Sequence, residues 1–114
     1  MEAAEIDDLA RAAIRLNAAI NNVTLTTSES DVVGSACRWD IILCGDICYE
    51  LPMTSYIMPW LRQMARDSIV WIADPGRAYL PLTGLSSIRR YLVPTSLELE
   101  DRVTRDVVLY RLTP

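Results

Sequence analysis

A chain of 114 residues, with 51% hydrophobic and 23% charged residues, has the composition of an ordinary globular domain. Its formal charge of -4 and its lack of a Lys/Arg cluster argue against a nucleic-acid partner, because that binding needs concentrated positive charge. The sequence contains neither an apolar run of membrane-spanning length nor a signal-peptide pattern, so we expect a cytoplasmic protein with no membrane partner.

The first predicted element is an amphipathic helix between Asp7 and Asn21, where apolar residues recur at three- and four-residue steps. Asp7 and Asp8 lie in its first turn, where carboxylates are favoured by the positive end of the helix dipole. The short β-branched segment Val23 to Thr27 then predicts a strand that runs into a polar loop at residues 28–34.

The almost continuously apolar run WDIILC, at residues 39–44, predicts a buried parallel strand. It ends at Gly45 and Asp46, so the strand delivers an acid at its carboxyl end. Residues Leu51 to Arg66 follow with a helical pattern. Pro59 lies inside that pattern and should kink the helix or split it in two.

The run SIVWIA, at residues 68–73, predicts a second buried strand, which also ends at an acid, Asp74. Residues Leu85 to Leu92 have helical spacing and a basic end, and they predict a third helix. Two closing strands are expected at Ser96 to Arg102 and Val107 to Leu112, and the short segment between them suggests an antiparallel pair. The order of these elements belongs to the α/β class.

Four segments of the sequence resemble one known family. They are AAEIDDLARAAIRLNA at residues 3–18, SDVVG at 30–34, WDIILCGDICYE at 39–50 and DPGRAYLP at 74–81. Their order and spacing resemble the class I S-adenosylmethionine-dependent methyltransferases, in particular the family of electron transfer flavoprotein β-subunit lysine methyltransferases. The last two segments are the specific ones, and the resemblance covers nearly the whole chain.

The resemblance implies a partial Rossmann-like sheet, mostly parallel, with an antiparallel pair of strands at the carboxyl end. It implies that residues 1–114 are the carboxy-terminal portion of a single methyltransferase domain. The family's first strand, its glycine-rich cofactor loop, its first helix and most of its second strand do not precede Met1, and no glycine of the chain lies in a GxG pattern. We therefore expect a truncated form or a segment of a larger enzyme, inactive by itself.

The resemblance implies that S-adenosylmethionine is the cofactor and that Glu5, Asp31, Val32 and Asp46 contact it. Glu5 matches the carboxylate that accepts hydrogen bonds from the ribose hydroxyls, and Asp31 matches the acid that accepts one from the adenine amino group. Val32 would cover the adenine ring. The residues alone also allow a plainer interpretation, in which Glu5 belongs to a solvated helix start and Asp31 to a turn.

Asp46, Tyr49 and Glu50 are the candidate catalytic residues. An acid at the carboxyl end of a buried strand projects into the crevice where open α/β sheets hold their ligands. A carboxylate there can orient an ammonium group, although it also raises the pKa of the amine and so opposes its deprotonation. We therefore assign Asp46 and Glu50 to substrate positioning before general-base catalysis. The alternative is that Asp46 caps the following helix.

Asp74, Arg77 and Tyr79 are the candidate substrate-binding residues, because the turn at Pro75 and Gly76 presents this segment over the crevice. Arg77 would either tie the loop to an acid or contact the protein substrate. No metal is expected, since the chain has no histidine and its thiols number three. The three cysteines are predicted to be reduced, and the three tryptophans are predicted to lie in the core.

The sequence thus predicts part of a protein-lysine N-methyltransferase whose protein substrate, by resemblance, is the electron transfer flavoprotein β subunit. Two alternatives stay open at this point. One is a small-molecule, nicotinamide-like N-methyltransferase, and the other is a degenerate, non-catalytic binding module. Because a sheet without its central strand exposes apolar edges, self-association or pairing with the missing amino-terminal segment is also expected.

Overall fold

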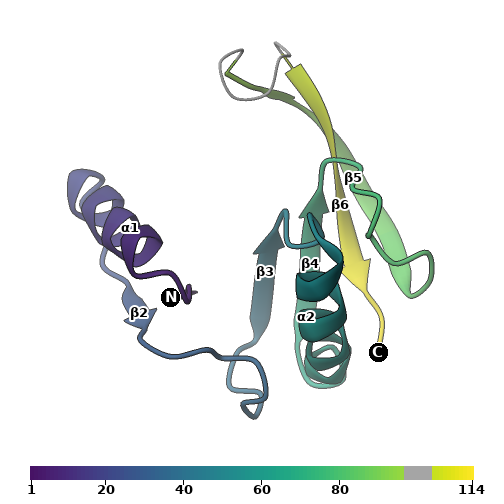
Figure 1. Ribbon diagram of the computed structural model, residues 1–114, viewed down its shortest axis with the longest axis horizontal. Helices are drawn as coiled ribbons and strands as arrows, with labels where there is room; N and C mark the ends of the chain where they lie inside the picture. Colours follow the sequence, from purple (N-terminus) through teal and green to yellow (C-terminus); the bar gives the residue numbers. More distant parts are fainter. Residues whose placement is uncertain (97–103) are drawn as a thin grey trace. The chain divides into compact units, whose positions relative to one another are not determined.

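The structure is a computed structural model of the chain, and it describes residues 1–96 and 104–114 (Figure 1). The chain divides into two compact units, Met1–Ser35 and Ala36–Pro114. Among the described residues, no helix has the length and apolar character that a membrane crossing requires.

The first unit is a strand, a helix and a second strand. Strand β1 (Glu2–Ala4) and strand β2 (Thr26–Ser28) pair in parallel, and helix α1 (Asp8–Ile20) connects them. The register joins Glu2 to Thr26 and Ala4 to Ser28, so the carboxyl ends of both strands lie at one edge. The strand predicted at residues 23–27 is shorter and begins later, at Thr26. Strand β1 agrees with the resemblance, which implied that the chain begins at the end of the family's second strand.

Helix α1 confirms its predicted bounds because its ends are fixed locally. The side chain of Asp7 accepts a hydrogen bond from the backbone N–H of Ala10 at 3.1 Å, which satisfies one of the free donors of the first turn. At the other end, the backbone N–H of Asn21 donates to the Asn17 carbonyl at 3.1 Å, and the backbone N–H of Asn22 donates to the Ala19 carbonyl at 3.2 Å. Both signals are readable from the sequence.

The second unit contains one mixed sheet and one long helix. Its strands are β3 (Ile41–Gly45), β4 (Ile69–Asp74), β5 (Leu85–Pro94) and β6 (Thr104–Leu112), and its helix is α2 (Leu51–Met64). The strand order is β3-β4-β6-β5. The β3–β4 pair is parallel, whereas β6 runs antiparallel to both of its neighbours. The α/β class and an antiparallel pair at the carboxyl end are thus confirmed, with β5 at Leu85–Pro94 as the partner of β6.

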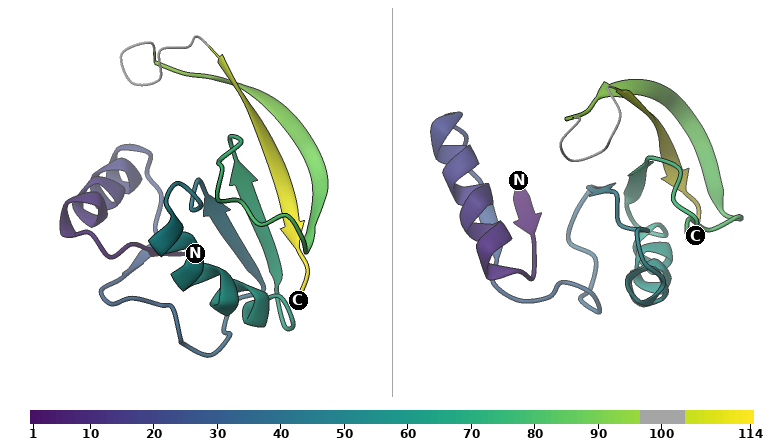
Figure 2. Two further views of the ribbon diagram at one scale, coloured as in Figure 1. Left: turned by 45° about the vertical axis from the view of Figure 1, so that its right-hand side comes forward. Right: turned by 45° about the horizontal axis from the view of Figure 1, so that its top comes forward.

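Helix α2 lies along one face of the β3–β4 pair (Figure 2), and the core of the second unit is formed there. Val70 and Ile72 of β4 are fully buried, as is Leu61 of α2. Trp60 of α2 is buried and meets Trp39 edge to face at a ring-centroid distance of 6.0 Å. The parallel pairing of β3 with β4, up to Gly45 and Ala73, sets the carboxyl ends of the two strands side by side.

Pro59 does not split α2, which is assigned as one helix from Leu51 to Met64. Proline removes one backbone donor from a helix, and this cost is offset here by burial on both sides of it. Met58, Leu61 and Met64 all lie in the core. Of the two predicted effects of Pro59, a kink or a split, the split was wrong.

The helix predicted at Leu85 to Leu92 was also wrong, because these residues belong to β5. Strand β5 pairs with β6 from Leu85↔Leu112 to Pro94↔Thr104, with a register shift between Ser87 and Arg89. The helical spacing of its apolar residues is overridden by this long pairing with a distant segment. Residues 97–102 of the strand predicted at Ser96 to Arg102 lie outside the described residues, whereas Val107 to Leu112 is confirmed as strand.

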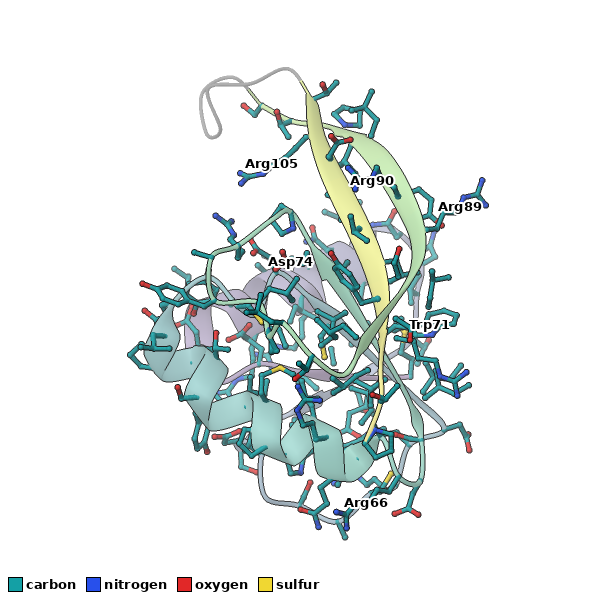
Figure 3. All side chains as sticks on the ribbon, turned by 90° about the vertical axis from the view of Figure 1, so that its right-hand side faces the viewer. Arg66, Trp71, Asp74, Arg89, Arg90 and Arg105 are labelled. Atoms are coloured by element: carbon teal, nitrogen blue, oxygen red, sulfur yellow. The ribbon has the colours of Figure 1, made fainter. Side chains whose placement is uncertain are left out.

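Strands β5 and β6 form a long ribbon that extends beyond the body of the second unit (Figure 1). Figure 3 labels Arg89, Arg90 and Arg105 along it. Arg89 stacks over Tyr91 at 5.6 Å, and Arg90 lies 3.9 Å from Asp106. Such exposed pairs contribute little to stability.

A stability prediction concerns Gly84, which adopts φ +77° just before β5. A Cβ atom there would meet the guanidinium of Arg62, which donates to the Thr83 carbonyl at 2.8 Å. Gly84→Ala is therefore expected to lower the free energy of unfolding by about 1 to 3 kcal/mol in urea titrations. Gly45→Ala is the matched control, since its Cβ would meet open space, and a change below about 0.5 kcal/mol is expected. Equal losses in both variants would contradict this account.

Candidate functional site

Two acids lie at the carboxyl ends of the parallel strands β3 and β4. Asp46 follows β3 directly, and Asp74 is the last residue of β4. The register joins Gly45 to Ala73, and the backbone N–H of Asp46 donates to the Ala73 carbonyl at 2.9 Å. Both acids therefore lie at the sheet edge where open α/β sheets hold their ligands.

The carboxylate of Asp74 is buried, with 1% of the residue exposed, and it shapes the turn that follows (Figure 3). Its Oδ2 accepts hydrogen bonds from the backbone N–H groups of Gly76 at 2.7 Å and Arg77 at 2.8 Å. Gly76 adopts φ +97°, which glycine allows without strain. Among the described residues, Asp74 Oδ1 has no hydrogen-bond partner.

This turn directs Arg77 toward Asp46. Arg77 Nε donates to Asp46 Oδ1 at 2.7 Å, and Arg77 Nη2 donates to Asp46 Oδ2 at 2.6 Å. The pair is bidentate, which is the strongest and most directional form of this interaction. Both side chains stay partly exposed, at 30% for Arg77 and 45% for Asp46, so a ligand could reach them.

The same geometry decides between the two interpretations of Asp46. Helix α2 has Glu50 as its N-cap residue, and Asp46 directs both of its oxygens to Arg77. Asp46 is thus not the helix cap that the sequence left open. It adopts φ +50°, which is uncommon outside glycine and often marks a functional position. Of the two roles considered for Arg77, the tie to an acid is the one present.

Two cysteines, Cys44 and Cys48, flank Asp46 in the sequence. Burial raises the pKa of the Cys48 thiol, a hydrogen bond with Thr54 partly lowers it, and the nearby carboxylates of Asp74 and Asp46 raise it further. Burial, with a smaller effect from Cys48, raises the pKa of Cys44 to about 12. Both thiols are therefore neutral near pH 7 and unsuited to nucleophilic catalysis. No group of three potential metal ligands gathers anywhere in residues 1–96 and 104–114.

Tyr49, Glu50 and Tyr79 lie in the loops that carry the site. Glu50 is the N-cap residue of α2, and its carbonyl accepts hydrogen bonds from Thr54, including one from the hydroxyl at 2.8 Å. Tyr49 is 52% exposed and Tyr79 is 46% exposed. Their places are compatible with contact to a substrate, and their roles remain predictions, as does substrate binding by Asp74.

The predicted cofactor residues of the first unit occupy the corresponding edge of the β1–β2 pair. Glu5 follows β1 and accepts a hydrogen bond from the Asp7 backbone at 3.1 Å. Asp31 follows β2 and accepts one from the Val33 backbone at 3.0 Å, and Val32 beside it is half-buried. Because β1 and β2 are parallel, the two acids follow the carboxyl ends of neighbouring strands.

Sequence reasoning missed Arg11, which connects the loops after both strands of the first unit. Its guanidinium donates to the carbonyls of Glu5 and Ser28 at 3.4 Å and of Glu29 at 2.8 Å, and it pairs with Asp8. An arginine on a predicted helix is usually solvated, so its spacing gave no signal. Arg11 thus holds the segments on which Glu5 and Asp31 lie.

The comparisons with known proteins agree on one fold. No family model matches the chain. A magnesium protoporphyrin IX methyltransferase from Synechocystis PCC 6803, solved with bound SAM, matches with a TM-score of 0.60 at 12% identity, over 99% of this chain and 59% of that chain. A mutant of MtNAS in complex with S-adenosylmethionine matches with a TM-score of 0.58 at 13% identity, over 99% and 45% of the two chains. The chain has the fold of the class I S-adenosylmethionine-dependent methyltransferases.

Within that class, the sequence is similar to the electron transfer flavoprotein beta subunit lysine methyltransferases, which confirms the resemblance. It is 29% identical to the Xenopus laevis protein of that name over 118 residues, covering 96% of this chain and 48% of the frog protein. It is 34% identical to the Danio rerio protein over 78 residues, covering 65% of this chain and 30% of the fish protein. The chain thus spans half or less of the length of these relatives.

Proposed function

We propose that the chain is part of an S-adenosylmethionine-dependent protein-lysine N-methyltransferase whose substrate is the electron transfer flavoprotein β subunit. The similarity to the frog and fish lysine methyltransferases supports the reaction and the substrate. The observation that carries the proposal is the position of Asp46, which is partly exposed at the carboxyl end of β3 and held in place by Arg77. Residues 1–114 would then belong to a single methyltransferase domain.

The residues of the first unit fit the nucleoside part of the cofactor. A ribose presents two neighbouring hydroxyl donors, and the carboxylate of Glu5 can accept from both. An adenine presents an amino donor, for which the carboxylate of Asp31 is a suitable acceptor, and an apolar ring face, against which Val32 can pack. Both acids follow parallel strands, as a nucleotide site in this class of fold requires.

The role of Asp46 follows from what methyl transfer demands. When bound, the cofactor supplies a methyl group on a positively charged sulfur, which leaves with the electron pair of the broken carbon–sulfur bond. The acceptor nitrogen must be neutral and aligned with the methyl carbon, and it afterwards loses a proton to water. Asp46 can accept an N–H hydrogen bond from that amine and fix the direction of its lone pair.

Transfer of a tritiated methyl group tests the proposal in the protein that carries this chain. Purified electron transfer flavoprotein β subunit, nicotinamide and a sample without acceptor are incubated in parallel with labelled S-adenosylmethionine. We expect label on the β subunit at least tenfold above the other two samples. Label on nicotinamide alone would favour the small-molecule methyltransferase, and label on neither acceptor would favour the non-catalytic binding module.

A further inference from the structure

The pairing of Asp46 with Arg77 bears on a difficulty in the proposed reaction. A lysine amine has an unperturbed pKa of ~10.4, so about one molecule in 10³ is neutral at pH 7.4. A free carboxylate beside the amine would hold the ammonium form and make the neutral nucleophile rarer still. The residue that orients the amine would therefore also oppose the reaction.

Arg77 changes this balance because its cation lies against both oxygens of Asp46. The two hydrogen bonds, at 2.7 and 2.6 Å, use one lone pair on each oxygen and leave the others available to a ligand. With Asp74 included, the local group holds two carboxylates and one guanidinium, which leaves one net negative charge instead of two. The other titratable groups carried by these loops are Cys48, Tyr49, Glu50 and Tyr79.

The position of Arg77 is prepared by the backbone before any ligand arrives. Asp74 accepts from the N–H of Arg77 at 2.8 Å and is itself buried, so the turn is anchored to the end of β4. The Arg77 side chain is only 30% exposed, which limits the weakening of the ion pair by water. The anchored turn therefore holds the positive charge of Arg77 next to the carboxylate of Asp46.

We propose that Arg77 is a positioning residue that neutralises and orients Asp46, so that Asp46 accepts a hydrogen bond from the acceptor amine without holding it in the ammonium form. This inference rests on the proposed function. In this role Arg77 affects the protonation of the acceptor amine through Asp46. It does not need to contact the surface of the protein substrate.

The test is the pH dependence of kcat, measured with the β subunit and saturating S-adenosylmethionine, for the parent protein and three variants. In the parent, the rate rises with pH along an acidic limb as the bound amine loses its proton. Arg77→Ala removes a positive charge, so the pKa of the bound amine rises and the limb moves to higher pH. We expect a shift of about one pH unit, with a loss of about tenfold at neutral pH and recovery at high pH.

Two control variants distinguish the effect of the Arg77 charge from the effect of its hydrogen-bond geometry and from the loss of any arginine. Arg77→Lys keeps the cation and loses the bidentate geometry, so its limb is expected within about 0.3 pH units of the parent while KM increases. Arg66→Ala removes the same charge from the exposed turn that follows α2, away from the Asp74 turn (Figure 3), and the acidic limb of this variant is expected to be unchanged. The inference would be overturned if the acidic limb of Arg77→Ala lay at the same pH as that of the parent protein. It would also be overturned if the limb moved by the same amount in all three variants.

A measurement without turnover distinguishes this failure from failure of the proposed function. The double-mutant cycle of Asp46→Asn and Arg77→Gln in urea unfolding reports the coupling between the two side chains. If the two side chains are coupled but the parent protein does not methylate the β subunit, the proposed function is refuted. The proposed role of Arg77 in the chemistry of the amine is then refuted as well. Detectable coupling with an active parent and an unshifted limb would refute the role of Arg77 alone. The absence of coupling would refute the pairing itself.

Discussion

Replacing Asp46 with alanine is expected to lower methyl transfer by roughly tenfold to one-hundredfold, because a hydrogen bond to a charged group contributes about 1.5 to 3 kcal/mol. The loss should appear in kcat at saturating substrate, since the side chain aligns the reacting nitrogen. The free energy of unfolding should fall by at most about 1 kcal/mol, since the Asp46–Arg77 pair is partly exposed.

The measurement combines single-turnover methylation with the thermal midpoint of the same preparations. Glu50→Gln serves as a second variant, for which weaker binding of the protein substrate is expected with little change in kcat. A destabilised Asp46→Ala protein that keeps its full rate per folded molecule would remove Asp46 from the site. The structure already argues against that outcome, because the N-cap residue of α2 is Glu50 and the oxygens of Asp46 accept from Arg77.

Replacing Asp74 with alanine is expected to cause the largest loss of stability among the site residues. Its carboxylate is buried and accepts from the backbone N–H groups of Gly76 and Arg77, which would both lose their acceptor. We expect the free energy of unfolding to fall by about 2 to 4 kcal/mol, and this is measured by urea titration. The turn at residues 75–77 should also become less ordered. Because this turn positions Arg77, the rate of methyl transfer should fall, as it is expected to do in Arg77→Ala.

Asp74→Asn is the matched control for this prediction. The asparagine keeps one oxygen that can accept from the turn and places a neutral donor where Oδ1 lacks a partner among the described residues. Its loss of stability should be less than half of that in Asp74→Ala. If alanine and asparagine destabilise the protein equally, the backbone hydrogen bonds of the turn are not the source of the stability.

The parts of the fold that local sequence determines were predictable. Helix α1 was located from its apolar spacing and from Asp7 and Asn21, which cap it. Strands β3 and β4 were located from short apolar runs that end at an acid. The burial predicted for both runs is confirmed in β4, where Val70 and Ile72 are fully buried. It was wrong for β3, where Ile41 is 49% and Leu43 is 69% exposed.

The parts that depend on distant pairing were not predictable. Strand β5 was taken for a helix, because its apolar residues have helical spacing and its partner β6 lies beyond a connecting segment. The hydrogen bonds between Arg77 and Asp46 join residues 31 positions apart, so the sequence offered only the alternative that Arg77 might bind some acid. Arg11 gave no signal, since its acceptors are carbonyls that any residue could supply.

We propose that this chain helps to place a methyl group on the side-chain nitrogen of a lysine, and that Asp46 aligns that nitrogen. The most direct test is mass spectrometry of the electron transfer flavoprotein β subunit after incubation with S-adenosylmethionine and the protein that carries this chain. We expect fragment ions that locate the added methyl groups on lysine nitrogens, with at least tenfold less modification when the Asp46→Ala variant replaces the parent protein. Methyl groups on another residue type, or equal lysine modification by the parent and Asp46→Ala, would contradict it.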